Sequence, residues 1–167
     1  YAAGENARSG AGQDAGAKTK SSIKELGDGR AYVEADRAVI RGKDPQRWAG
    51  QITKFINEEI RHGRNVTVYG ADGDPLTITR DTAGKAQFRN TVRELDGTVR
   101  PMFNDEYATK LRAEAHVDEL AQVSRRGWRT VPDAKNHRFA RDGFNYRTAY
   151  FKDASGYYRL TLSVGQN

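Results

Sequence analysis

Two stretches near the C-terminus alternate between apolar and polar side chains at the two-residue period of a β-strand. In the second stretch, one face would carry Tyr158, Leu160, Leu162 and Val164, and the other Tyr157, Arg159, Thr161 and Ser163. In the first stretch, a single face would carry Phe144, Tyr146, Thr148 and Tyr150. Because the intervening Asp153-Ala-Ser-Gly156 is typical of a turn, the two stretches predict one β-hairpin with a core face and a polar face.

The register of this hairpin decides which side chains share a surface. If Lys152 pairs with Tyr157, the polar face gathers Tyr146, Thr148, Tyr150, Arg159, Thr161 and Ser163. A slip of one residue would scatter this set, because every side chain of the slipped strand would change face. We take the first register as the expectation and the polar face as the candidate functional surface.

The preceding chain predicts helices and one further hairpin. Asp44 followed by Pro45 indicates a helix start, apolar residues at helical spacing continue to Ile60, and Gly63 suits the helix end. Residues 66–69 and 76–79 predict a hairpin, residues 32–34 a short strand, and residues 105–124 a helix capped by Asn104. Residues 81–101 stay ambiguous. This mixture predicts the α+β class, with helices packed on a small antiparallel sheet.

The N-terminal residues differ in composition from the rest. Residues 1–22 are rich in Gly, Ala and Ser and hold almost no large apolar side chains, which is typical of a linker or a poorly ordered lead-in. We therefore expect one domain over residues 23–167. The chain starts at Tyr1 rather than Met, and this favours a fragment of a longer protein.

Composition narrows the possible partners. The net charge of +6 and the sequence pI of about 9.6 favour an anionic partner: a nucleic acid, a membrane surface or an acidic protein. The chain has no cysteine and three scattered histidines, so disulfides and thiolate metal sites are excluded, and no metal or cofactor is expected. No apolar run approaches the ~20 residues that span a bilayer, so we expect no membrane insertion.

Basic and aromatic residues are interleaved in the C-terminal region. Between Arg125 and Arg159 there are nine Lys or Arg, three Asp and eight aromatic residues. This mixture suits single-stranded nucleic acid, because cations bind phosphates and rings stack on unpaired bases. If the ligand is RNA, cleavage needs no protein nucleophile: the ribose 2′-OH attacks its own phosphorus, and the protein supplies a base, an acid and a cation.

Several side chains are candidates for these roles, and each has a structural alternative. His116, His137 or a tyrosine would move protons; Arg141, Arg147 or Arg159 would bind phosphate; Thr161 and Ser163 would orient it. His116 lies on an apolar helix face, where a lone histidine is more often a satisfied core or interface residue. His137 is equally explained as a solvated loop residue. A tyrosine stripe is more often sheet packing than an active site, and Asp142-Gly143 is most simply a turn.

The segment NHRFARDGFNYRTAYFKD (residues 136–153), followed by GYYRLTLSVG (156–165), resembles the C-terminal toxin domains of the barnase–EndoU–colicin–RelE superfamily. These domains occur in contact-dependent and other polymorphic bacterial toxins and in large polyvalent phage proteins. The stretch YATKLRAEAHVDEL (107–120) is similar to the helix before that motif. The resemblance covers residues 29–167 and is strongest after Thr109, with 102–167 as the main motif region. Superfamily members continue with a further strand, whereas this chain stops at Asn167.

The resemblance implies an RNase-toxin-like fold and a metal-independent ribonuclease acting on RNA, commonly tRNA, to give a 2′,3′-cyclic phosphate. It also implies delivery as part of a secreted or cell-surface protein, action in the target-cell cytoplasm, and inhibition by a cognate immunity protein. Because the hairpin surface is basic and aromatic, we expect an acidic surface on that inhibitor. The catalytic residues expected by position are His116, His137, Arg141, Tyr146, Tyr150, Thr161 and Ser163. The expected nucleic-acid-binding residues are Arg138, Arg147, Arg159 and Asp142.

Two other functions stay open. One is a non-catalytic nucleic-acid-binding module within a larger polyvalent or phage-associated protein. The other is a nucleotide-transferring toxin such as an ADP-ribosyltransferase, for which the sequence shows no convincing Arg, Ser-Thr-Ser and Glu-x-Glu set; the pair Glu58-Glu59 is typical of a solvated helix face.

Overall fold

A computed structural model describes residues 22–84, 91–129, 144–154 and 156–165. The lead-in expected over residues 1–22 lies outside these ranges except for its last residue. The helical elements are η2 Arg37–Val39, α2 Pro45–Phe55, η3 Ile56–Ile60, α3 Arg80–Gly84, α4 Asn104–Ala115 and α5 Val117–Val123. The strands are β1 Ile23–Glu25, β2 Ala31–Glu34, β3 Val66–Tyr69, β4 Pro75–Ile78, β5 Thr91–Arg93, β6 Val99–Pro101, β7 Arg125–Arg129, β8 Phe144–Asp153 and β9 Gly156–Gly165.

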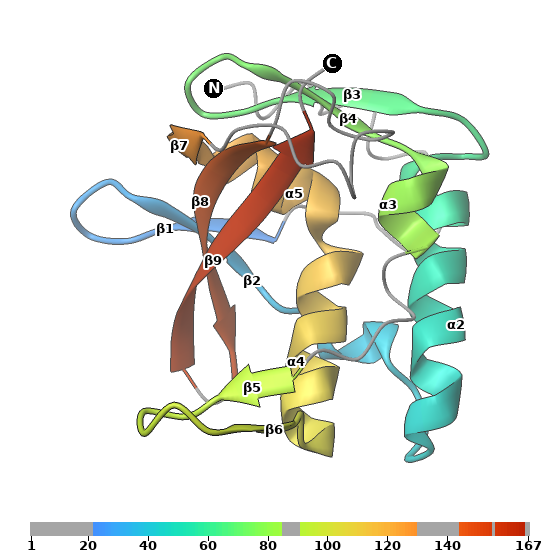
Figure 1. Ribbon diagram of the computed structural model, residues 1–167. Helices are drawn as coiled ribbons and strands as arrows, with labels where there is room; N and C mark the ends of the chain where they lie inside the picture. Colours follow the sequence, from blue (N-terminus) through green and yellow to red (C-terminus); the bar gives the residue numbers. More distant parts are fainter. Residues whose placement is uncertain (1–21, 85–90, 130–143, 155, 166–167) are drawn as a thin grey trace.

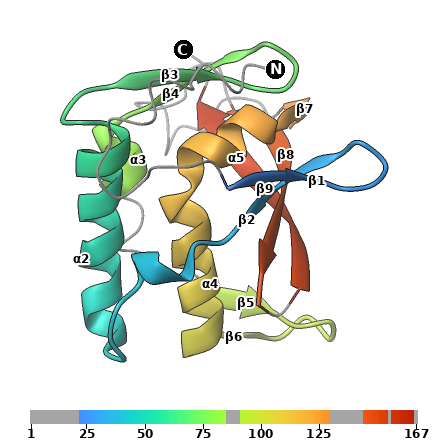
Figure 2. The same ribbon diagram turned by 180° about the vertical axis from the view of Figure 1, so that it is seen from behind.

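The described elements form layers, with α4 and α5 in the middle (Figures 1 and 2). The sheet that contains β8 and β9 lies on one side of these helices, and α2 lies on the other. The β3–β4 hairpin crosses one end of this arrangement, and the β5–β6 hairpin lies at the other end. The fold is therefore mixed α+β, as predicted, with helices packed on a small sheet.

The main sheet is organised around β8. Strand β9 pairs with β8 along its whole length, and Lys152 lies opposite Tyr157, which confirms the predicted register. Because β9 occupies one edge of β8, the other edge is shared: β7 pairs near Arg147, and β2 pairs at Phe151 and Lys152, with β1 outside β2.

The expectation of a purely antiparallel sheet was wrong in one pairing. Strand β2 runs parallel to β8, with Val33 opposite Phe151 and Glu34 opposite Lys152. More than a hundred residues separate the two strands in the sequence. A parallel pair needs such a long crossover connection, and here the crossover includes the helices that cover the sheet.

The helix predicted from Asp44 is confirmed at its start, whereas at its end the first residue beyond the C-cap Arg61 is His62, with a φ of 51°, and not Gly63. The Asp44 carboxylate accepts a hydrogen bond from the Gln46 amide at 3.0 Å, and Pro45 is the first helical residue. The helix continues as the π-helical turn η3, and Gly63 beyond it has a φ of +78°. One face of α2 and η3 packs on α4, and their shared core consists of Trp48, Ile52, Ile56, Ile60, Tyr107, Ala108, Leu111 and Ala115, together with Ile78 and Ala83.

The helix predicted over residues 105–124 is present, but it is broken at His116 into α4 and α5. Its N-terminal cap also differs from the prediction. Asn104 is the first helical residue, and the Glu106 carboxylate accepts from the Phe103 amide at 2.8 Å. The opposite side of these helices packs on the sheet, in a second core of Val33, Ala113, Leu120, Ala149 and Phe151.

The hairpin expected over residues 66–79 is confirmed, with Val66 opposite Ile78. The ambiguous residues 81–101 contain α3 and the β5–β6 hairpin in their described parts. Arg100 connects this second hairpin to the first turn of α4, because its guanidinium binds both Glu94 and Glu106 at 2.8 Å.

Candidate nucleic-acid interface

The face of β8 and β9 that points away from the helices carries the predicted polar set. Tyr146, Thr148 and Tyr150 are half-buried, and their cross-strand partners are Ser163, Thr161 and Arg159. Arg159 and Thr161 are exposed; the side chain of Ser163 lies outside the described part of the structure. The alternate residues Ala149 and Phe151 are buried against the helices. We call the first surface the outer face of the sheet.

Neighbouring strands enlarge the outer face with residues that the sequence argument missed. Tyr32 and Glu34 flank the buried Val33 in β2, and Lys24 pairs with Tyr32 from β1. From β7, Arg125 lies opposite Thr148. The local signal was the alternation Tyr-Val-Glu in residues 32–34, but nothing local reveals that this strand pairs with β8.

The outer face is predominantly basic. Its cations are Lys24, Arg30, Arg125, Lys152 and Arg159, and its carboxylates in the described strands and turn are Glu34 and Asp28. Asp28 binds Arg30 at 2.7 Å, and this hydrogen bond lowers the pKa of the Asp28 carboxyl. Within the described ranges, Lys24, Arg125, Lys152 and Arg159 form no ion pair with a carboxylate, so their charges are available to an anionic ligand.

Arg147 does not belong to this surface. Its side chain is 1% exposed and lies on the helix side of the sheet. It donates to the Ser124 hydroxyl at 2.8 Å, to Asp72 at 2.6 Å and to Asp74 at 3.1 Å. The structure therefore does not support the expected phosphate contact by Arg147: this residue attaches the β3–β4 turn to the sheet.

The same attachment affects Asp72. Burial opposes ionisation, but hydrogen bonds from Arg147 and from backbone amides outweigh it and lower the pKa of Asp72 to about 2. Gly70 makes the close approach possible, because a Cβ at this position would lie 2.2 Å from the Arg147 Nη2 atom.

His116 is buried, and both of its ring nitrogens have partners. Its Nε2 accepts from the Asp36 amide at 2.9 Å, so Nδ1 carries the proton and donates to the Glu119 carboxylate at 3.0 Å. The other Glu119 oxygen accepts from the Ser22 amide at 2.8 Å. This geometry favours a structural role for His116. Directly through Asp36 and indirectly through Glu119 and Ser22, His116 connects the break between α4 and α5 to the residues that precede and follow the β1–β2 hairpin.

The remaining predicted residues, His137, Arg138, Arg141 and Asp142, lie outside the described residues. They precede β8 in the sequence and stay predictions. Among the residues that the structure describes, no group of three or more His, Cys, Asp or Glu is placed to hold a metal ion. None of the described helices is both long enough and apolar enough to cross a membrane.

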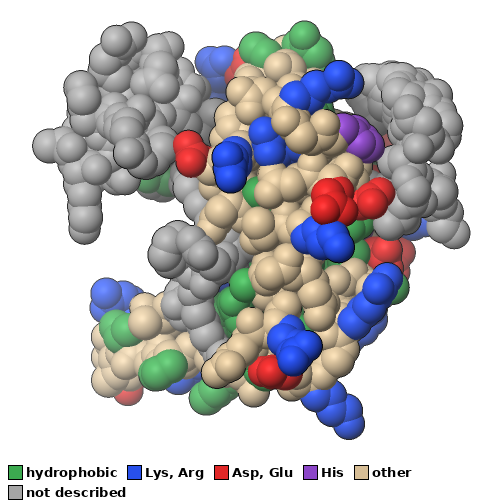
Figure 3. Space-filling view, turned by 90° about the vertical axis from the view of Figure 1, so that its right-hand side faces the viewer, with side chains coloured by type: hydrophobic (Ala, Val, Ile, Leu, Met, Phe, Trp, Pro, Cys, Tyr) green, Lys and Arg blue, Asp and Glu red, His purple; other side chains and the backbone are tan. Residues whose placement is uncertain are grey.

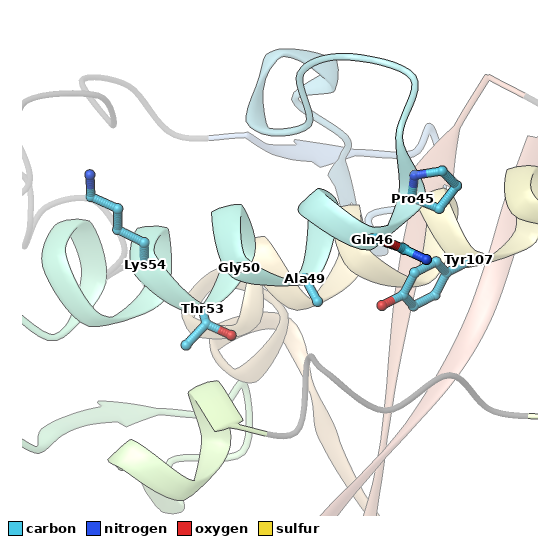
Figure 4. A pocket seen from close by; sticks show the side chains of 7 residues that line it. All are labelled: Pro45, Gln46, Ala49, Gly50, Thr53, Lys54 and Tyr107. Carbon is cyan, nitrogen blue, oxygen red and sulfur yellow. The ribbon is translucent and has the colours of Figure 1, made fainter.

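The opposite side of the molecule looks different. Over α2, basic side chains are spread across the surface with acidic ones among them (Figure 3). An open hollow of about 690 Å³ lies there, lined by one side of α2 and, beside Pro45 and Gln46, by Tyr107 of α4 (Figure 4). Among the described residues that line it, the ionisable side chains are Lys54 and Tyr107, so this described lining holds fewer cations than the outer face.

Comparisons of the chain with protein-family models, with curated proteins and with solved structures found no match. The case for a function therefore depends on the chemistry of the outer face.

Proposed function

We propose that the outer face binds single-stranded RNA and that the domain is a metal-independent endoribonuclease. The observation that carries this proposal is the pairing of Tyr146, Thr148 and Tyr150 with Ser163, Thr161 and Arg159 on one surface. Hydroxyl groups and rings lie there beside Lys24, Arg125, Lys152 and Arg159, which have no carboxylate partner among the residues that the structure describes. Rings suit unpaired bases, and cations suit the phosphates between them.

The cleavage step follows from the ribose rather than from a protein nucleophile. The 2′-OH loses its proton to a base and attacks the adjacent phosphorus; the bond from phosphorus to the 5′-oxygen breaks, and an acid protonates that oxygen. The products are a 2′,3′-cyclic phosphate and a free 5′-OH. Arg141 is our candidate for stabilising the charge on the phosphorane, with Thr161 as a hydrogen-bond donor. Arg159, which pairs with Tyr150, is our candidate for binding a neighbouring phosphate.

We do not assign proton transfer to His116, because this residue is buried in the core. His116 is enclosed and doubly bonded, so we assign the acid or base role to His137, with Arg141 as the cation at the phosphorane. Both residues precede β8, whose first residues include Tyr146 opposite Ser163. The reaction is therefore expected at this end of the hairpin.

The resemblance extends the proposal to biology. Under it the RNA is tRNA, the domain is delivered as part of a secreted or cell-surface protein to the cytoplasm of a target cell, and an immunity protein protects the producer. The basic, aromatic outer face supports an acidic inhibitor that occupies the RNA surface, because complementary charge speeds association and buried aromatic and arginine side chains hold a complex.

One observation favours a second candidate, a non-catalytic RNA-binding module: none of the described side chains on the outer face is a histidine. Incubation of total RNA with the domain in EDTA separates the two functions. Discrete fragments with 2′,3′-cyclic phosphate ends, lost in His137→Ala and retained in an Ala variant of exposed His62, support the ribonuclease. Intact RNA together with tight RNA binding supports the module.

A further inference from the structure

A second group of side chains reaches the outer face from the edge of the sheet. Since Val33 lies opposite Phe151 in the parallel β2–β8 pair, Tyr32 is placed beside Tyr150. Tyr157 reaches the same place from β9, and its ring centroid is 5.3 Å from that of Tyr32. Tyr32 and Tyr157 therefore contact each other, and the register places Tyr150 beside Tyr32, nearer to the β8–β9 turn than Tyr146 is.

The Tyr32 and Tyr157 rings are arranged edge to face; Tyr32 is half-buried and Tyr157 is exposed. The Tyr32 and Tyr157 ring planes meet at 78°, and Tyr157 is 56% exposed. Burial, reinforced by a hydrogen bond with Tyr157, raises the pKa of Tyr32. An ordinary tyrosine is already neutral at physiological pH, and this shift keeps the Tyr32 phenol neutral beside a phosphate.

Two cations border the rings. The Arg30 guanidinium lies 5.6 Å from the Tyr150 ring centroid, and the Lys152 ammonium 5.3 Å from that of Tyr157. Asp28 holds Arg30 through a 2.7 Å contact, which limits the orientations of the guanidinium. The core does not require this cluster, because the buried packing of β2 and β8 is made by Val33 and Phe151 on the other face.

We propose that Tyr32, Tyr150 and Tyr157, with Arg30 and Lys152, form a binding site for an unpaired nucleobase and its adjoining phosphate. This inference rests on the proposed function and deepens it, because it separates a base-binding end of the outer face from the cleavage end near Tyr146. Paired bases do not fit, since the faces of a stacked duplex are not available to a ring. The substrate is therefore single-stranded at least one nucleotide away from the bond that is cut.

The test compares two probes of equal length and equal phosphate number: an oligothymidylate and an oligomer of abasic deoxyribose phosphates. Neither has a 2′-OH, so neither is cleaved, and only the first can stack. Stacking of one base on an aromatic side chain corresponds to an affinity difference of about 5- to 150-fold. We expect the wild-type domain to prefer the base-bearing probe within this range, as measured by fluorescence anisotropy.

Three variants locate the preference. Tyr157→Leu should remove most of it while leaving the salt dependence of binding unchanged, because no charge is lost. Tyr32→Phe should retain it, since the ring remains. Tyr69→Leu is the matched control, because Tyr69 is 63% exposed on β3, away from the outer face, and its loss should change nothing.

The outcomes separate this site from the proposed function. Equal binding of both probes by wild type, or an equal loss for both probes in Tyr157→Leu, overturns the base site even if RNA is cleaved in EDTA. A base preference that Tyr157→Leu abolishes supports the site even if no RNA is cleaved, and then only the ribonuclease proposal fails. Failure to bind either probe, or single-stranded RNA, overturns both.

Discussion

The two faces of β8 use charged residues in opposite ways. On the inner face Arg147 is bound by Asp72, Asp74 and Ser124, and Asp153 is bound by Arg37, Arg112 and Thr109. On the outer face, Lys152 of β8 and Arg159 of β9 have no carboxylate partner within the described residues. A buried charge has to be compensated, so inner-face charges hold the fold together. Within the described residues, the outer-face cations Lys24, Arg125, Lys152 and Arg159 remain available to a ligand.

The largest expected effect is a loss of stability when the ion pairs of Arg147 on the inner face are removed. Arg147→Gln leaves the Asp72 and Asp74 carboxylates without their buried partner, and loss of one member of such a pair costs about 3 kcal/mol. We expect the free energy of unfolding in urea to fall by about this amount. If Arg147→Gln instead keeps wild-type stability and loses RNA affinity, the assignment of Arg147 to the inner face is wrong.

The pH dependence of stability tests the ion pair between Arg147 and Asp72 separately. The pKa of Asp72 is lowered from 3.8 to about 2, so the folded state favours the ionised carboxylate. Because Asp72 is an exposed residue, solvent screening limits its contribution to stability to about 1 kcal/mol. This contribution is fully present above about pH 4 and is lost as the pH falls toward 2. Urea unfolding between pH 2 and 6 should show a smaller pH dependence in Arg147→Gln than in wild type; an identical dependence would exclude this coupling.

The outer-face counterpart is Arg159→Gln, which removes the same charge from the neighbouring strand. Because Arg159 is exposed and unpaired within the described residues, the free energy of unfolding should change by less than about 0.5 kcal/mol. The affinity for single-stranded RNA should fall, and the slope of log affinity against log salt should decrease by about 0.7, the value for one phosphate contact on a single strand. An unchanged slope would remove Arg159 from the phosphate-binding set.

The smallest expected effect concerns the β5–β6 hairpin, which is not a strand pair of the main sheet and lies at the end of the molecule opposite the β3–β4 hairpin (Figure 1). Leu95 at its tip is fully exposed, and it touches neither core. Leu95→Ser should therefore leave both stability and RNA affinity at wild-type values within error. Any loss of RNA affinity in this variant, measured by anisotropy, would show that the RNA surface extends beyond the sheet.

The sequence was informative where the structure is local. The β8–β9 register followed from a short turn and strict alternation, and α2 followed from Asp44, Pro45 and the apolar spacing. The break at His116 was not foreseen, because it depends on hydrogen bonds to Asp36 and Glu119 that form only in the folded chain.

The errors about the site have the same origin. The alternation of β8 already put the Arg147 side chain on the other face of the strand from Tyr146 and Thr148. Its charge alone suggested a phosphate ligand, but its partners in the structure lie on the β3–β4 turn, which is distant in the sequence. Tyr32 and Lys24 were missed because a parallel pairing across more than a hundred residues leaves no local pattern. Local periodicity thus gives the face of a residue, and tertiary contacts decide its role.

Photo-crosslinking tests the central claim most directly. A single-stranded RNA with 5-iodouridine at each position is irradiated with the domain in EDTA, and the linked tyrosines are located by mass spectrometry. The outer face predicts crosslinks at Tyr32, Tyr146, Tyr150 and Tyr157, competed by unlabelled single strand and not by duplex. Crosslinks at Tyr69 and Tyr107, with the four outer-face tyrosines unmodified, would contradict the account.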